Sequence, residues 1–244
     1  SINRLPYRGT LLNTLTVTVG ALVGLWVGRA MSFDLKTVAM SGIGLVVACM
    51  GVKMFLETKN VLVPTIAVVA GGLLGAWVGI DVGLDSFAEW VRTGLNGGDR
   101  FNEGLITASV IFCVGPLTLL GCVKDGLERD IGLLAFKSLL DGIGAVFFAA
   151  TLGAGVLASA AVVLVVQGLI TAFAKPLRPL AEKPQIVAEA TAAGGAIMLA
   201  IGINLLGLRE ELRTEVFLPA LFIAPLVAPL FLKKPRSGGH DETA

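Results

Sequence analysis

The chain has few charged residues and a single histidine. Charged side chains make up 15% of its 244 residues, against about 25% in an average soluble domain. The histidine, His240, lies in the polar segment 233–244, and the three cysteines form no Cys-x-x-Cys pair. A histidine-based zinc site, or a catalytic triad that uses histidine, is therefore not expected in the apolar part of the chain.

Signatures of several other functions are also missing. Neither a P-loop nor a His-Glu-x-x-His motif occurs, so the sequence indicates neither nucleotide hydrolysis nor zinc proteolysis. The formal net charge of +1 provides no basic surface for nucleic acid. We therefore expect no enzyme activity, no cofactor, no metal and no nucleic-acid partner.

Long apolar runs dominate what is present. Apolar residues account for 55% of the chain, mean hydropathy is +0.84, and 31 glycines are available for close helix packing. The charges gather in short islands between runs of about 20 residues, the length that a membrane helix needs. The sequence predicts an all-α, polytopic membrane protein with about eight transmembrane helices in a lipid bilayer. The predicted segments are 10–28, 37–56, 61–80, 104–123, 131–152, 154–174, 186–207 and 216–232.

Two regions deviate from simple spans. Segments 131–152 and 154–174 are joined by almost no linker, which predicts a tight helical hairpin or, alternatively, a re-entrant pair. Residues 82–95 are too short and too charged to span, although Leu84, Phe87 and Val91 recur at helical spacing. This pattern predicts either an amphipathic helix in the membrane interface or a surface helix packed on the bundle.

A weak internal repeat relates the two parts of the chain. The first three segments align in order with the fourth, seventh and eighth, and each pair joins an odd-numbered segment to an even-numbered one. Partners would then cross the membrane in opposite directions, which predicts an inverted-topology repeat, a frequent plan of secondary transporters. In this prediction, residues 9–80 are the first repeat and 104–232 the second, with the hairpin 131–174 inserted. Chance similarity of glycine-rich helices is the alternative. The matches are Gly9 with Gly104, Gly44 with Gly195, Gly51 with Gly202 and Pro64 with Pro219.

Asp141 lies near the middle of an apolar segment, and Lys137 precedes it by one helical turn. Residues four apart share a helix face, so we expect the two side chains to meet. A charge at that depth costs about 2.5–3.5 kcal/mol even on the mild insertion scale, and such charges commonly serve function. We interpret Asp141 as a proton or coupling-cation site. A structural ion pair that sets helix register is the alternative.

Other polar side chains inside the apolar segments are candidates for the same pathway. Each has a structural alternative, because hydroxyls bond back to their own helix, a glutamate caps a helix start and amides join neighbouring helices. Pro116 is expected to kink or break the fourth segment and to free a backbone carbonyl there. The candidate pathway residues, besides Asp141 and Lys137, are Asn13, Thr14, Thr107, Ser109, Gln167, Glu189 and Asn204.

Short stretches spread over nearly the whole chain form a recognisable set. They are residues 9–14, 107–109, 112–115, 138–142, 151–153, 167–168, 202–207 and 218–220. As a set they resemble the bacterial inner-membrane family called domain of unknown function 554. The resemblance implies a polytopic inner-membrane protein of a bacterium and supplies no substrate. Pro116 departs from the small residue expected there in many relatives, so a site built on that kink would be particular to this chain.

Taken together, these features predict a membrane transport protein, and specifically an ion-coupled secondary transporter of a small solute or cation. A channel or pore is one alternative, and a structural membrane protein without transport is another. The polar groups within the segments are few and mostly neutral, which favours a small cation, an amino acid or an amine as substrate. A homodimer is compatible with every one of these hypotheses.

The distribution of lysine and arginine predicts the orientation. These residues are more numerous on the side that would hold both termini, so both termini are expected in the cytoplasm. A fluorescent protein fused after Ala244 should therefore fluoresce in bacterial cells, and a periplasmic phosphatase fused there should be inactive. The reverse pattern would contradict the prediction.

Overall fold

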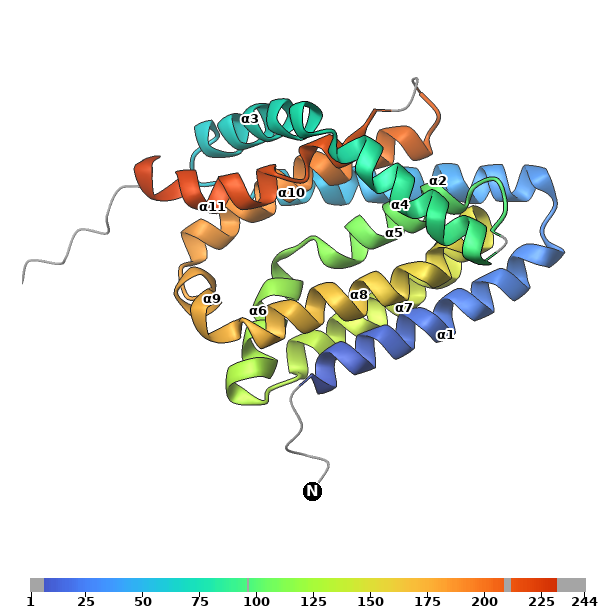
Figure 1. Ribbon diagram of the computed structural model, residues 1–244, viewed down its shortest axis with the longest axis horizontal. Helices are drawn as coiled ribbons and strands as arrows, with labels where there is room; N and C mark the ends of the chain where they lie inside the picture. Colours follow the sequence, from blue (N-terminus) through green and yellow to red (C-terminus); the bar gives the residue numbers. More distant parts are fainter. Residues whose placement is uncertain (1–6, 96, 209–211, 232–244) are drawn as a thin grey trace, which may run out of the picture.

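The computed structural model describes residues 7–95, 97–208 and 212–231, and in these ranges the chain is all-helical (Figure 1). The predicted polar tail 233–244 lies outside the described residues. The elements are α1 (Arg8–Ala30), α2 (Phe33–Phe55), α3 (Leu62–Val78), α4 (Ile80–Leu95), α5 (Phe101–Cys113), α6 (Pro116–Glu128), α7 (Gly132–Leu152), α8 (Gly155–Ala172), α9 (Ala174–Ala181), α10 (Pro184–Leu205), the 3₁₀ turn η2 (Thr214–Phe217) and α11 (Ala220–Phe231).

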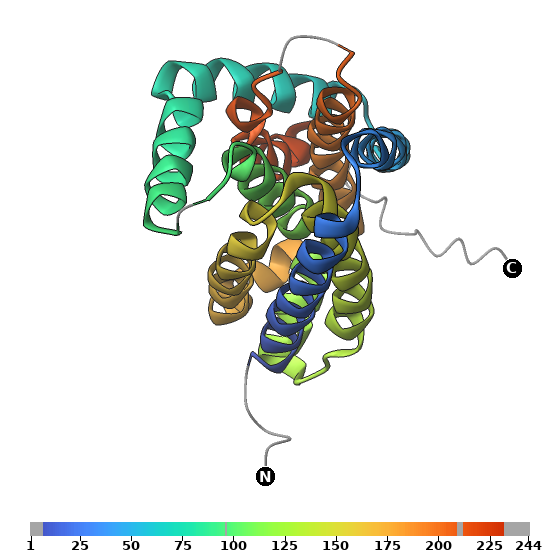
Figure 2. The same ribbon diagram turned by 90° about the vertical axis from the view of Figure 1, so that its right-hand side faces the viewer.

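The helices form two groups, one above the other in Figure 1. The upper group contains α2, α3, α10 and α11, and the lower group contains α1, α6, α7 and α8. Helix α5 lies between them, and α4 packs on α5 beside η2. Figure 2 shows α1 lying along α7 in the lower group, with α2 and α10 in the upper one.

Glycines bring the helix backbones together within each group. A Cβ atom at Gly24 of α1 would lie 2.2 Å from the carbonyl oxygen of Val146 in α7, closer than real atoms approach. In the upper group, a Cβ atom at Gly51 of α2 would lie 2.7 Å from the carbonyl oxygen of Gly195 in α10. Lipid tails are as apolar as leucine, so membrane helices associate largely through such close packing.

Length and apolarity identify six helices as candidate membrane spans among the described residues. Two further pairs of helices would each make one broken span or a re-entrant loop, which gives six to eight spans: α3 with α4, bent by 60°, and α5 with α6, bent by 63°. The prediction of about eight membrane segments in an all-α chain is thereby confirmed.

The fourth predicted segment is broken, as expected from Pro116. Helix α5 ends at Cys113, and Gly115 has φ 132°, a conformation that strains any residue with a Cβ atom. Pro116 then begins α6, where its missing N–H costs nothing. The sequence placed this segment at 104–123, whereas the two helices extend from Phe101 to Glu128.

The remaining segments agree with prediction except at one helix. The hairpin is present as α7 and α8, both long and apolar enough to span. The last segment is irregular, a 3₁₀ turn followed by a helix that contains Pro225 and Pro229. Helix α9 (Ala174–Ala181) lies almost entirely between the sixth and seventh predicted segments, where no helix was predicted, and its apolar spacing is interrupted by Lys175 and Arg178.

Residues 82–95 form a helix, as predicted, within α4. Ala88 is completely buried and packs with Phe101 and Leu105 of α5, while Trp90 is 74% exposed. The helix is thus packed on the bundle along one face and exposes an aromatic residue on the other.

Replacement of Gly24 by alanine should destabilise the protein by about 1–3 kcal/mol, because the added methyl group overpacks the contact between α1 and α7. Gly42 in α2 is the matched control, since a Cβ atom there meets nothing within 4 Å. Gly42→Ala should be neutral or stabilising by up to about 1 kcal/mol. Thermal unfolding in detergent measures both; equal effects would contradict the proposed packing.

Candidate functional site

A buried ion pair lies on α7. Lys137 Nζ donates to Asp141 Oδ2 at 2.6 Å, and their side chains are only 7% and 9% exposed. The pair forms because residues four apart on a helix face one another. The prediction that these two side chains meet is confirmed.

Asn13 of α1 completes the arrangement. Its Nδ2 donates to the same oxygen, Asp141 Oδ2, at 2.9 Å, and the Asn13 side chain is completely buried. The approach is possible because α1 and α7 pack closely, with Gly142 lying against Thr16. Within the described part of the chain, Asp141 Oδ1 accepts no hydrogen bond. Oδ2 of Asp141 thus accepts two hydrogen bonds, and Oδ1 remains available to a ligand.

The ion pair borders a cavity of about 740 Å³. The cavity lies between α2, α7 and the junction of α5 with α6, and so between the upper and lower groups. Lys53 and Glu57 near the end of α2 also line it. Lys137 and Asp141 therefore contact one another directly, and both also line the wall of this cavity.

A second cavity, of about 410 Å³, shares three lining residues with the first: Val114, Gly115 and Pro116. Apolar side chains of α4, α5, α8, α10 and α11 form most of its wall. Ser109 of α5 also lines it, and the Ser109 hydroxyl is buried without a hydrogen-bond partner in the described residues. The break between α5 and α6 is consequently the partition between two cavities.

Gln167 is completely buried on α8, and neither atom of its amide has a hydrogen-bond partner in the described residues. Thr171, one turn further along α8, lies 3.3 Å from the hydroxyl of Thr10 in α1. Thr14 donates its hydroxyl to the carbonyl oxygen of Thr10, the local bond expected of a helical threonine. Thr107 is half-buried on α5.

Glu189 is fully buried and holds a loop. Its carboxylate accepts hydrogen bonds from Thr58 Oγ1 at 2.6 Å and from the backbone N–H groups of Lys59 and Asn60 at 2.7 and 3.0 Å. The glutamate of α10 therefore caps the connection between α2 and α3 rather than the start of its own helix.

Asn204, near the end of α10, binds the main chain of the segment that follows this helix. Its Nδ2 donates to the carbonyl oxygen of Leu212 at 2.8 Å, and its Oδ1 accepts from the Leu212 N–H at 2.9 Å. Asn204 and Glu189 thus contact loops, whereas Asn13 and Lys137 both donate hydrogen bonds to Asp141. The structure therefore brings together only part of the set predicted from sequence.

Asp125 is a buried carboxylate that the sequence reasoning missed. It is completely buried on α6, and its Oδ2 accepts a hydrogen bond from the Gly9 N–H at the start of α1, at 3.0 Å. In the sequence it belongs to a charged island after the fourth segment. Its three-residue spacing from Cys122, on the buried face of α6, is the signal that indicates burial.

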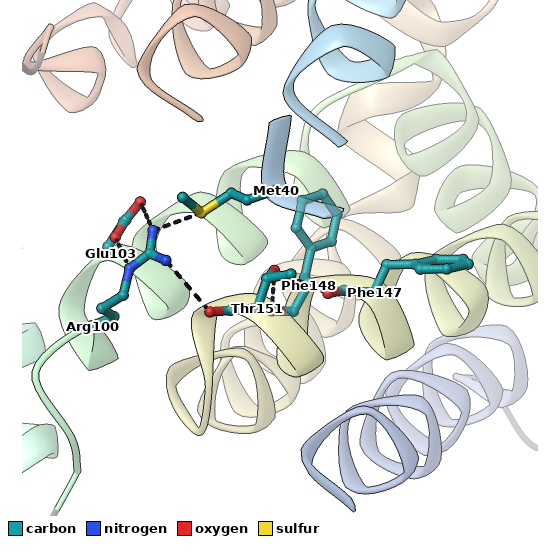
Figure 3. A network of polar contacts seen from close by, with 6 residues as sticks. All are labelled: Met40, Arg100, Glu103, Phe147, Phe148 and Thr151. Atoms are coloured by element: carbon teal, nitrogen blue, oxygen red, sulfur yellow. Dashed lines mark hydrogen bonds and ion pairs between the residues drawn. The ribbon is translucent and has the colours of Figure 1, made fainter. Parts of the chain in front are cut away.

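A polar network around Arg100 connects the two groups (Figure 3). Arg100 at the start of α5 donates to Glu103 at 2.8 and 2.9 Å, and its Nη2 lies 2.8 Å from the sulfur of Met40 in α2. Its Nη1 donates to the carbonyl oxygen of Thr151 in α7 at 3.5 Å. Arg100 thereby joins α2, α5 and α7.

Among the described residues no group of three or more His, Cys, Asp or Glu side chains is placed to hold a metal ion. The candidate site consists of one carboxylate, one ammonium group and one amide. Of these, the carboxylate is the group that can bind either a proton or a small cation.

Comparison with known proteins gives one family. The profile of the family described as Protein of unknown function (DUF554) matches residues 8–229. The chain is 28% identical over 223 residues to the uncharacterized membrane protein YdfK of Bacillus subtilis, covering 90% of this chain and 94% of that protein. It is 24% identical over 227 residues to the uncharacterized protein YqgA of Escherichia coli, covering 90% and 96%. No solved structure matches it significantly.

Removal of the ammonium group alone should be costly. Lys137→Met leaves the Asp141 carboxylate buried without its counter-charge, and the free energy of unfolding should fall by about 3–5 kcal/mol. The double variant Lys137→Met, Asp141→Leu should recover much of the loss, because no unpaired charge remains.

Arg178 and Glu182 provide the matched control, since they have the same four-residue spacing and are about 60% exposed. Arg178→Met should change stability by no more than about 0.5 kcal/mol. Denaturant unfolding in detergent compares the three variants. A Lys137→Met variant as stable as Arg178→Met would contradict the burial of the pair.

Proposed function

The chain belongs to the DUF554 family of multi-pass membrane proteins, and on this premise we propose that it is an ion-coupled secondary transporter of a small solute or cation in a bacterial inner membrane. Asp141 is the ion-binding group, Lys137 its counter-charge and Asn13 the residue that orients it. The observation that carries the proposal is the position of this pair at the wall of a 740 Å³ cavity between two groups of helices.

The small stabilisation expected from a buried ion pair favours a functional role for Asp141. A buried ion pair adds little net stability compared with apolar residues of similar size. Ionisable groups at membrane depth commonly mark ion pathways. In Asp141, one oxygen accepts from both Lys137 and Asn13, while the other accepts no hydrogen bond from a described residue. A cation or proton that binds the second oxygen would compete with Lys137 for the carboxylate charge.

The break in the fourth segment supports a pathway between the two groups. Backbone groups that leave a helix within a membrane are tolerated where they line a cavity. Val114, Gly115 and Pro116 line both the 740 Å³ and the 410 Å³ cavities. A rotation of α5 against α6 at Gly115 would therefore change the separation between the two cavities, as a gate in alternating access would do.

The contacts between α2 and α10 support the inverted repeat. The alignment pairs Gly44 with Gly195 and Gly51 with Gly202, and a two-fold axis would exchange the partners. A Cβ atom at Gly44 would lie 3.1 Å from the carbonyl oxygen of Gly202, and one at Gly51 would lie 2.7 Å from that of Gly195. These two contacts make α2 and α10 antiparallel, which is the relation that partners in an inverted-topology repeat have.

Asp141→Asn should lose coupled transport, because the amide keeps the shape of the carboxylate but carries no charge. Since this change leaves the buried Lys137 ammonium without its counter-charge, its fold is first checked by gel filtration and circular dichroism, and the variant Lys137→Met, Asp141→Asn, which holds no unpaired charge, is assayed beside it. The purified protein is reconstituted in liposomes, and uptake of small cations, amines and amino acids is measured under an imposed proton or sodium gradient. The wild type should show saturable, gradient-coupled uptake of one of these, and Asp141→Asn only background.

Asp130→Asn is the matched control, since Asp130 is an exposed aspartate just before α7. It should transport as the wild type does. Undiminished uptake by Asp141→Asn would refute the assignment of Asp141. Ohmic current without saturation would instead identify a channel.

A further inference from the structure

Buried polar side chains gather at the end of the lower group where α1 begins. Thr10, Asn13, Asp125 and Gln167 are completely buried, and Thr171 is 4% exposed. They come from α1, α6 and α8. These five residues are here called the polar column.

Successive contacts along α1 order the column. Near the end of the molecule, Asp125 accepts from the Gly9 N–H at 3.0 Å. Next along α1, the hydroxyls of Thr10 and Thr171 lie 3.3 Å apart. Deeper still, Asn13 donates to Asp141 at 2.9 Å. The column therefore leads from the start of α1 to the carboxylate of Asp141.

Gln167 lies at the deeper level of the column. The start of α1 meets the end of α8 through Thr10 and Thr171, so the two helices run in opposite directions. Gln167 precedes Thr171 by one turn, and Asn13 follows Thr10 by about one turn. The side chain of Gln167 is thus placed on α8 at the depth of Asn13 on α1.

Several polar atoms of the column have no protein partner. Among the described residues these are Asn13 Oδ1, Asp125 Oδ1, and both Nε2 and Oε1 of Gln167. Buried polar groups in native proteins are almost always hydrogen-bonded, to water where protein groups do not suffice. The unpaired set contains a donor as well as acceptors. Water satisfies both, whereas a bare metal ion would leave Gln167 Nε2 unpaired.

We propose that the polar column is a water-filled route by which a small monovalent cation reaches Asp141 from the face of the molecule where α1 begins. Carboxylate, amide and hydroxyl oxygens suit a small hard cation as it exchanges water ligands. The role of the route in coupling rests on the proposed transport function, whereas its hydration does not.

Cys122 provides a native probe of this route. It is completely buried on α6, beside Thr171 and Thr10. In the variant Cys49→Ser, Cys113→Ser, it is the remaining thiol. Silver ion, a small monovalent cation that binds thiols, is applied to oriented membrane vesicles. The thiol that stays free is then counted with a fluorescent maleimide after denaturation.

A matched control separates hydration from general opening of the structure. Ser159 on α8 is also completely buried, and its hydroxyl is satisfied by the carbonyl oxygen of Val156 at 2.7 Å. Ser159→Cys is placed in a background with all three native cysteines replaced by serine. Silver should react with Cys122 at least about tenfold faster than with the Ser159→Cys thiol, because a dry site is reached only by local unfolding.

The reaction of Cys122 should also occur from the face where α1 begins and not from the opposite face. Thr171→Val, which removes a polar group from the column and keeps its volume, should slow it. The Ser159→Cys and Thr171→Val variants must first give the circular dichroism spectrum and gel-filtration profile of the wild type. Equal rates at Cys122 and at the Ser159→Cys thiol, or reaction only from the opposite face, would overturn the proposal.

The result of the silver experiment is independent of the result of the transport assay. Silver reaches the thiol whether or not the substrate is known, so rapid labelling without any transport would retain the hydrated column and remove its coupling role. Gradient-coupled transport with an unreactive Cys122 would retain the transporter and reject this route.

Discussion

The structure depends on the burial of one ion pair, Lys137 with Asp141, in an otherwise apolar helix. An unpaired charge in that position would lower the free energy of unfolding by about 3–5 kcal/mol. The two side chains are therefore paired with one another and with a further polar partner. Asn13 supplies that partner from α1. Its contact requires the backbones of α1 and α7 to approach closely, which glycines such as Gly20 and Gly24 allow. Electrostatics and backbone packing thus specify the same register between the two helices.

The break between α5 and α6 at Gly115 shapes the region between the upper and lower groups. A continuous fourth helix would present a regular wall, with all its backbone groups satisfied internally. Instead α5 and α6 meet at 63°, and the residues between them line two cavities. Gly115 is needed because its φ of 132° is strained for other residues, and Pro116 is tolerated because it begins the next helix. Arg100 joins the groups at another point through Met40 and Thr151.

Sequence reasoning predicted most of the fold because membrane helices carry a strong, local signal. A run of about 20 apolar residues suffices to identify a span. The Lys137–Asp141 contact was also predictable, since it depends on spacing within one helix. By contrast, α9 was missed because Lys175, Arg178 and two prolines obscure its short apolar pattern. Asp125 was read as part of a charged island, although its side chain is buried against Gly9.

The polar residues illustrate the same limit. Glu189 was placed at a helix start, where a carboxylate commonly caps its own helix. Its actual partners, Thr58, Lys59 and Asn60, are about 130 residues distant in sequence. Asn204 likewise bonds the main chain of Leu212, eight residues later, a contact that no local pattern predicts. No local pattern contains this information, because each contact depends on how separate helices are packed.

The sequence by itself determined that this protein is an all-helical membrane protein and that one helix carries an acidic and a basic side chain on the same face. Both follow from short-range rules, the hydropathy of a span and the 3.6-residue period of a helix. Only the tertiary structure decided that Asn13 reaches Asp141, that Asp125 and Gln167 are buried on neighbouring helices, and that a cavity borders the ion pair. Those features arise from the mutual placement of helices distant in sequence, which close backbone contacts at glycine select.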